Sequence, residues 1–157
     1  MSRNVDYSQF KAFAKKLEKI DKGKQAFMES CCKELAARLL SRVIKRTPVG
    51  IDNGGNLRRG WTGGVENVSE KGGVIGVSGK TGSASKINVV YRNGEYRCAI
   101  FNPVYYASYV EFGHRTRGGG GWVNGQFFLT ISESKVEALA PALLEKRLMA
   151  YLMEAMK

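Results

Sequence analysis

The sequence predicts a single domain of the α+β class, in which a small antiparallel β-sheet of about four strands packs against N-terminal helices and a C-terminal helix. Apolar residues recur at helical spacing near both ends of the chain, whereas the middle holds short runs separated by turn residues. Helices grouped apart from strands, rather than alternating with them, are typical of this class. The length of 157 residues fits one domain over residues 1–157.

The helical region 1–46 is predicted to contain two helices. Over residues 7–21, apolar side chains recur at helical spacing, with a stripe of lysines on the opposite face. Gly23 is expected to end this helix, and a longer pattern then continues to Arg46. Thr47 stands before a proline and marks the stop, because a residue before proline avoids the α region. We expect both helices to supply one side of the core, with the lysine stripe in solvent.

The stretch from Thr47 to Trp61 is predicted to be a loop because it is rich in Pro, Asn and Gly, with Leu57 and Trp61 as its anchors. A β-meander over residues 61–101 follows. Its four predicted strands are 61–68, 73–77, 87–92 and 95–101. Asn93-Gly94 is a strong hairpin signal between the last two strands, and Gly79 to Ser85 is expected to be a long mobile connection.

Beyond the strands, the aromatic segment 105–113 is predicted to be a short helix, and the basic, glycine-rich segment 114–126 a mobile loop. Apolar residues at helical spacing predict a C-terminal helix over residues 127–157. Pro141 lies inside that pattern, so the helix either kinks there or begins afresh near Ala140.

The charge of the chain is positive and uneven. Lys and Arg number 25 against 14 Asp and Glu, which gives a net charge of +11, and residues 1–60 alone hold 14 minus 6, or +8. Such a field favours a polyanion or an acidic protein surface as partner, but it does not choose between them. No apolar run approaches the length of about 18 residues that a membrane span needs, so no membrane partner is expected.

The sequence offers no positive case for catalysis, for a cofactor or for a metal. The fragment that ends in Gly79-Lys80-Thr81 resembles a phosphate-binding loop, but the spacing requires glycine at position 74, where Val74 stands. His114 is the single histidine, and no paired carboxylates or metal-ligand spacing occur. The three cysteines include an adjacent pair and are interpreted as reduced core residues. We therefore expect a protein that is not an enzyme.

Nucleic-acid binding remains as an alternative function, that of a small basic nucleic-acid-binding domain. Cationic and aromatic residues of the kind used on single strands occur together, although no zinc finger, RNA-binding strand motif or helix-turn-helix accompanies them. These residues are Arg58, Arg59, Trp61, Arg115, Arg117 and Trp122. Core anchoring by the tryptophans and loop solubility from the arginines explain them equally well.

Three blocks of sequence, in a fixed order, resemble a known family. The blocks are Thr47-Pro48 with the LRRGW of Leu57 to Trp61, Phe101 to Pro103 leading into YYASYVEFG, and Trp122, Val123, Gly125 and Phe127. The diagnostic residues of the second block are Tyr106, Ala107, Tyr109, Glu111, Phe112 and Gly113. Their order and spacing resemble the tail-completion or head-to-tail joining (neck) proteins of tailed bacteriophages. The chain departs from the compact TPVDTGxL turn of these proteins, since it has TPVGIDNGGNL.

The resemblance implies a non-enzymatic virion protein that completes the tail or joins tail to head, commonly as a hexameric ring. It further implies contacts with other copies of itself, with tail-tube proteins and with head-connector proteins. DNA would pass through the ring without sequence-specific contact. The protein would be made in the bacterial host cytoplasm and reside in the tail or neck of the virion. Tail terminator, tail completion factor and head-side stopper all fit the sequence, as do several ring sizes.

Ring subunits contact each other head to tail, so we expect interface residues in and beside the glycine-rich loop. The candidates are Tyr106, Tyr109, Glu111, Phe112, Arg115, Arg117 and Trp122. The three aromatic residues before Gly113 are expected to pack the last strand onto the C-terminal helix, or to lie partly between subunits. Glu111 is expected to pair with Arg115 or with an arginine of the adjacent subunit, so that Glu111→Lys weakens assembly without unfolding the monomer.

Overall fold

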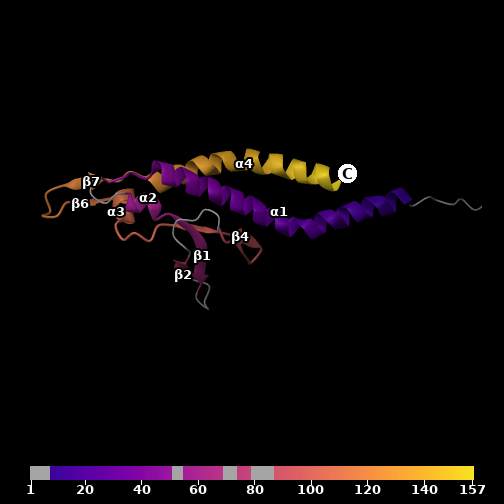
Figure 1. Ribbon diagram of the computed structural model, residues 1–157, viewed down its shortest axis with the longest axis horizontal. Helices are drawn as coiled ribbons and strands as arrows, with labels where there is room; N and C mark the ends of the chain where they lie inside the picture. The colour runs from indigo at the N-terminus through magenta and orange to yellow at the C-terminus, as the bar shows by residue number, and fades with distance from the viewer. Residues whose placement is uncertain (1–7, 51–54, 69–73, 79–86) are drawn as a thin grey trace, which may run out of the picture.

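The computed structural model describes residues 8–50, 55–68, 74–78 and 87–157. Two long helices dominate it: α1 (Ser8–Arg46) and α4 (Phe128–Ala155) lie side by side and run in opposite directions (Figure 1). The short elements lie along one side of this pair and at the end where α4 begins (Figure 1). Fold class α+β, with helices at both ends of the chain and antiparallel strands between them, is confirmed.

The strands form three small antiparallel sheets instead of one meander. The elements of this part are α2 (Asn56–Arg59), β1 (Thr62–Val68), β2 (Val74–Ser78), β3 (Val90–Arg92), β4 (Glu95–Arg97), β5 (Ala99–Phe101), α3 (Ala107–Phe112), β6 (Gly113–Arg115) and β7 (Trp122–Asn124). The first sheet has the order β2-β1-β5, with Thr62 opposite Phe101 and Val65 opposite Ser78. The β1–β2 pair projects away from the helices (Figure 1).

The predicted strand order is wrong. A meander would pair the second strand with the third, whereas β3 and β4 form a separate two-stranded sheet. Asn93 and Gly94 both have positive φ, 51° and 84°, as a tight two-residue hairpin turn requires, so the predicted turn is present. The chain then returns to β1 through β5, and β4 and β5 both lie against α1. The predicted connection Gly79 to Ser85 lies outside the described residues.

Gly23 does not end a helix, because α1 runs through it without a break. A glycine inside a helix costs only about 1 kcal/mol relative to alanine, which packing readily offsets. The packing here comes from Tyr151 of α4, whose hydroxyl donates to the carbonyl of Ile20 at 2.8 Å and whose ring stacks on Phe27 at 4.6 Å between centroids. A Cβ at position 23 would lie 2.4 Å from that hydroxyl oxygen. Gly23 therefore lies at a point where the two helices approach each other.

The C-terminal helix also runs through its proline, so a fresh start near Ala140 is wrong. Pro141 removes one backbone donor, the one that would bond the carbonyl of Glu137. Both residues are exposed, which leaves that carbonyl within reach of water. The helix is held by its contact with α1.

The core centres on Leu40, Val43, Leu57, Trp61 and Phe128 and joins α1, the 55–61 segment and the start of α4.

Thr47 ends α1 as predicted and is fully buried beside this core. Its hydroxyl accepts a hydrogen bond from Trp61 Nε1 at 2.7 Å and donates to the carbonyl of Val43 at 2.6 Å. Arg58 donates two hydrogen bonds, of 3.0 and 2.7 Å, to the carbonyl of Thr47. The indole ring of Trp61 meets Phe128 edge to face, with 5.8 Å between centroids. Leu57 and Trp61 thus fix the segment after α1 in the core.

Asn102 links that segment to the strand that precedes α3. Its side-chain amide donates to the carbonyl of Leu57 at 2.6 Å, and its side-chain oxygen accepts from the backbone of Val104 at 3.1 Å. A Cβ at Gly60 would lie 2.5 Å from the Asn102 side-chain oxygen. Only glycine therefore allows the two segments to come this close.

We expect Gly23→Ala to destabilise the protein by about 1–3 kcal/mol, the usual cost of overpacking, instead of stabilising the helix. Tyr151→Phe removes the clashing oxygen, so in that background Gly23→Ala is expected to be neutral or stabilising by up to about 1 kcal/mol. Urea unfolding of the two single variants and the double variant measures this coupling. Equal effects of Gly23→Ala in both backgrounds would mean that the helices do not meet at this point.

Thr47→Val is expected to cost about 1–3 kcal/mol of unfolding free energy, because it leaves the buried indole N–H of Trp61 without an acceptor. Thr116→Val is the matched control, since Thr116 is exposed and its hydroxyl bonds only a turn carbonyl. The control should change stability by less than about 0.5 kcal/mol. Urea midpoints that fall equally for both variants would contradict the role given to Thr47.

Candidate assembly interface

The predicted mobile loop 114–126 is instead a β-hairpin formed by β6 and β7, with Gly113 opposite Asn124 and Arg115 opposite Trp122. Thr116 closes the turn, because its backbone N–H and its hydroxyl both bond the carbonyl of Gly121, at 3.0 and 3.2 Å. Gly118 and Gly119 have φ of 110° and 78°, a region that residues with a side chain rarely adopt. The glycines thus form a tight turn and not an unstructured loop.

This hairpin is fixed to α3 by close contact between backbones. A Cβ at Gly125 would lie 2.3 Å from the carbonyl oxygen of Glu111, and one at Gly113 would lie 2.5 Å from the carbonyl oxygen of Val123. The backbone N–H groups of Gln126 and Phe127 donate to the carbonyls of Val110 and Glu111 at 2.9 and 3.1 Å. The C-terminal end of α3 and the segment after β7 are therefore joined directly.

Glu111 is only 3% exposed, and its carboxylate holds the first turn of α4. Its Oε2 accepts from the backbone N–H of Leu129 at 3.0 Å, and its Oε1 accepts from the backbone N–H and the hydroxyl of Thr130 at 2.9 and 2.8 Å. Phe127 is the residue just before α4. Its φ is 49°, and its side chain does not cap the helix. Glu111 replaces that cap from another helix, where its negative charge also suits the positive end of the helix dipole.

The expected pairing of Glu111 with Arg115 is therefore wrong within the described chain. The carboxylate is buried against N–H donors, whereas Arg115 is exposed on the hairpin. A lysine at position 111 would place a buried cation against the same donors, so Glu111→Lys is expected to unfold the start of α4. It would not act selectively on assembly as the sequence suggested.

The aromatic candidates divide into one partly buried residue and several exposed residues. Tyr106 packs against the core cluster, which agrees with its predicted place between the last strand and the C-terminal helix. Tyr109 and Phe112 are instead 55% and 60% exposed, and Trp122 of β7 is 59% exposed. Arg115 and Arg117 are exposed near them. We call the exposed apolar set Tyr105, Tyr109, Phe112, Trp122, Val123 and Phe127 the aromatic end.

A second set of exposed apolar residues belongs to the opposite end of the helix pair. At that end α1 begins and α4 ends (Figure 1). The set consists of Phe10, Phe13 and Leu17 of α1 with Met149, Met153 and Met156 near the end of α4, and we call it the helical tip. Phe10 is 70% and Met153 is 64% exposed. The sequence assigned the α1 residues to the core. They lie outside it because α1 extends past the end of α4, where Lys16 Nζ bonds the carbonyl of Met156.

The signal for this overhang is the difference in helix length. With 39 residues in α1 and 28 in α4, the difference of 11 residues corresponds to about 16 Å of helix. The predicted break at Gly23 hid this difference, because it divided α1 into two shorter helices.

Cys31, Cys32 and Cys98 form no disulfide among the described residues, and burial raises the pKa of Cys98 to about 11 and also raises the pKa of Cys32. The described ranges contain no group of three or more His, Cys, Asp or Glu placed to hold a metal. Nor does any helix in that part of the chain have the length and apolarity needed to cross a membrane.

Residues 11–113 match the HK97-gp10-like family, a bacteriophage tail component. The match covers more than half of the chain, and the chain belongs to this family. It includes most of α1, the Thr47 and Trp61 contacts and α3, and it ends at Gly113, before the block that begins at Trp122. Comparison with curated proteins and with solved structures gave no match. Family membership gives the protein a structural role in a bacteriophage tail.

Glu111→Gln is expected to cost about 1–3 kcal/mol of unfolding free energy, since the amide keeps one acceptor where the carboxylate serves three donors. Urea unfolding measures the cost, and hydrogen exchange should show faster exchange at Leu129 and Thr130.

Glu133→Gln is the matched control in the same turns of α4. Burial, and then the charges of Glu111 and Glu137, raise the pKa of Glu133, so its charged form is disfavoured in the fold. Removing that charge at pH 7 should leave stability unchanged or slightly higher. A larger loss for Glu133→Gln than for Glu111→Gln would refute the capping role.

Proposed function

We propose that subunits of this protein assemble head to tail into a ring that completes the phage tail or joins it to the head. The observation that carries this proposal is the presence of two different exposed apolar surfaces, the aromatic end and the helical tip, at opposite ends of an elongated subunit (Figure 1). A head-to-tail contact uses two unlike surfaces of each subunit, and such contacts close into rings when the rotation between subunits allows.

The composition of the two surfaces supports their pairing. The aromatic end offers large rigid rings, the residues that most often dominate binding energy at interfaces. The helical tip offers three methionines and two phenylalanines, and methionine adapts its shape to an aromatic partner with a favourable sulfur–ring contact. Exposed apolar surface of this kind on a soluble protein commonly marks an interaction site.

The rest of the proposal follows from the resemblance to tail-completion and neck proteins. The ring is expected to be a hexamer, to contact tail-tube and head-connector proteins, and to reside in the virion after assembly in the host cytoplasm. It performs no catalysis in this role. Terminator, completion factor and stopper all fit a head-to-tail ring equally well.

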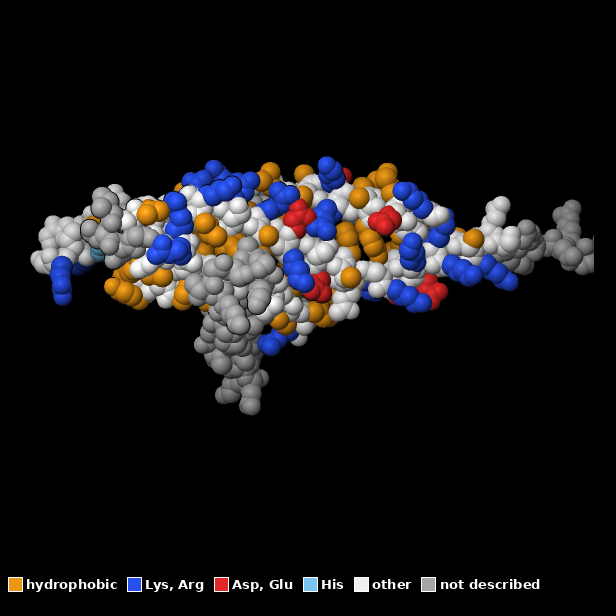
Figure 2. Space-filling view, viewed as in Figure 1, with side chains coloured by type: hydrophobic (Ala, Val, Ile, Leu, Met, Phe, Trp, Pro, Cys, Tyr) orange, Lys and Arg blue, Asp and Glu red, His pale blue; other side chains and the backbone are white. Residues whose placement is uncertain are grey.

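The alternative of a small nucleic-acid-binding domain draws support from charge. Lys and Arg side chains outnumber acidic ones over the face seen in Figure 2. The six residues first considered for single-strand binding do not gather at one site, because Trp61 is buried in the core whereas Trp122 is exposed on the hairpin. A ring subunit that contacts DNA in its channel would also be basic, so charge alone does not favour the alternative.

Two variants, each defective at one surface, test the head-to-tail pairing by native mass spectrometry. Phe112→Ser/Trp122→Ser removes the aromatic end, and Phe10→Ser/Met153→Ser removes the helical tip. Each variant alone is expected to stay monomeric, because it retains one surface and lacks that surface's partner. An equimolar mixture should form dimers and nothing larger, since just one competent junction exists between the two variants.

The control is Tyr91→Ser/Leu139→Ser, which removes exposed apolar side chains that belong to neither surface. It should assemble like the unaltered protein. If the unaltered protein is monomeric in solution, all variants are compared by negative-stain imaging on tails that lack this component, where either defective variant should give no ring. Rings formed by either defective variant, or dimers formed by one alone, would contradict head-to-tail assembly.

A further inference from the structure

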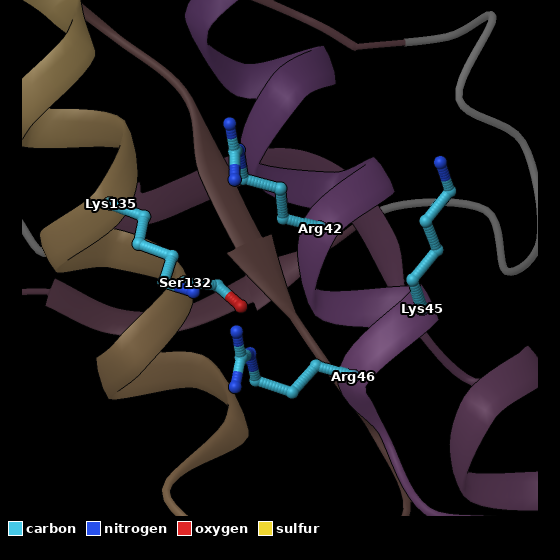
Figure 3. A pocket seen from close by; sticks show the side chains of 5 residues that line it. All are labelled: Arg42, Lys45, Arg46, Ser132 and Lys135. Carbon is cyan, nitrogen blue, oxygen red and sulfur yellow. The ribbon is translucent and has the colours of Figure 1, made fainter.

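A basic groove lies between the last turns of α1 and the first turns of α4. It has a volume of about 390 Å³ and is lined by Arg42, Lys45 and Arg46 of α1 and by Ser132 and Lys135 of α4. Figure 3 shows Arg42 and Arg46 extending from α1 toward the side where Ser132 and Lys135 stand, with Lys45 pointing away. Arg42 and Arg46 of α1 thus face the start of α4, where Lys135 and a single hydroxyl lie.

None of these cations takes part in the described ion pairs. Glu34, the carboxylate nearest along α1, is already bonded by Arg38 and Arg147. Arg38 and then Arg147 lower the pKa of Glu34 against the effect of its burial. No acidic side chain lines the groove itself. Like charges gathered without a counter-charge repel each other, and an anionic ligand would relieve that repulsion.

We propose that this groove binds the phosphate backbone of double-stranded DNA without reading its sequence. Arginine presents a planar fork of donors that matches phosphate oxygens, and lysine supplies a further point charge. A second hollow along α1 shares Arg42 and Lys45 and also includes Arg38, which is paired with Glu34 in the same wall. From Arg42 to Arg46 the helix rises about 6 Å, enough to reach neighbouring phosphates of a duplex.

The lining of the groove favours a duplex over a single strand. Single-strand sites place aromatic side chains against the bases, and no aromatic residue lines this groove. Arginine clusters also recognise acidic peptides, so binding of a poly-glutamate peptide is measured beside binding of the duplex. A phosphate backbone, which is uniform and highly charged, is the ligand that these residues fit. The proposal does not rest on ring assembly.

Fluorescence anisotropy with a labelled duplex of about 30 base pairs tests the proposal over a range of salt concentrations. Non-specific binding should show a Kd of about 10⁻⁴–10⁻⁶ M near physiological salt and be equal for unrelated sequences. Each lost phosphate contact should reduce the slope of log K against log salt by about 0.9. Arg42→Gln/Arg46→Gln/Lys135→Gln should therefore reduce it by about 2.7, and each single variant by about 0.9.

Lys11→Gln/Lys15→Gln/Lys19→Gln is the matched control, because it removes the same charge from exposed lysines at the other end of α1. Circular dichroism verifies that each variant is folded, and the single variants replace any triple variant that is not. Equal reduction of the slope by groove and control variants would overturn the proposal in favour of diffuse charge. Groove-dependent binding of a poly-glutamate peptide without groove-dependent binding of the duplex would also overturn it, since the ligand would then be an acidic protein.

Discussion

The contact between the buried Glu111 carboxylate and the first turn of α4 determines how the two halves of this molecule fit together. Phe127, the residue just before α4, has no side chain able to cap the helix. The free N–H groups of the first turn therefore take their acceptor from Glu111 of α3. Gly125 lets the backbones approach closely enough for this to happen. Because the β6–β7 hairpin lies between these elements in the chain, the same contact fixes the direction in which the aromatic end faces.

Several residues that carry the resemblance to phage neck proteins serve the inside of the fold. Thr47 and Trp61 bond each other, Asn102 bonds the segment that contains Gly60, and Glu111 holds α4. The same blocks also contain the exposed residues of the aromatic end, whereas the helical tip lies outside them. The resemblance therefore covers both core contacts and one of the two proposed contact surfaces.

Local chemistry was enough to predict the stop at Thr47-Pro48, the turn at Asn93-Gly94 and the helix after Phe127, because each depends on neighbours in the chain. The errors came from contacts between distant segments. Gly23 looked like a helix end because its partner, Tyr151, lies on another helix. The glycine-rich segment looked mobile because its order comes from strand pairing and contact with α3. Glu111 was given the wrong partner because helix capping from another element leaves no local pattern.

Head-to-tail contact between the aromatic end and the helical tip is the central claim, and an electron cryomicroscopy reconstruction of the assembled tail end tests it most directly. The account predicts a closed ring in which Phe112 and Trp122 of each subunit lie against Phe10 and Met153 of the next. A ring in which aromatic ends face each other across a two-fold axis, or in which both surfaces face solvent, would contradict it.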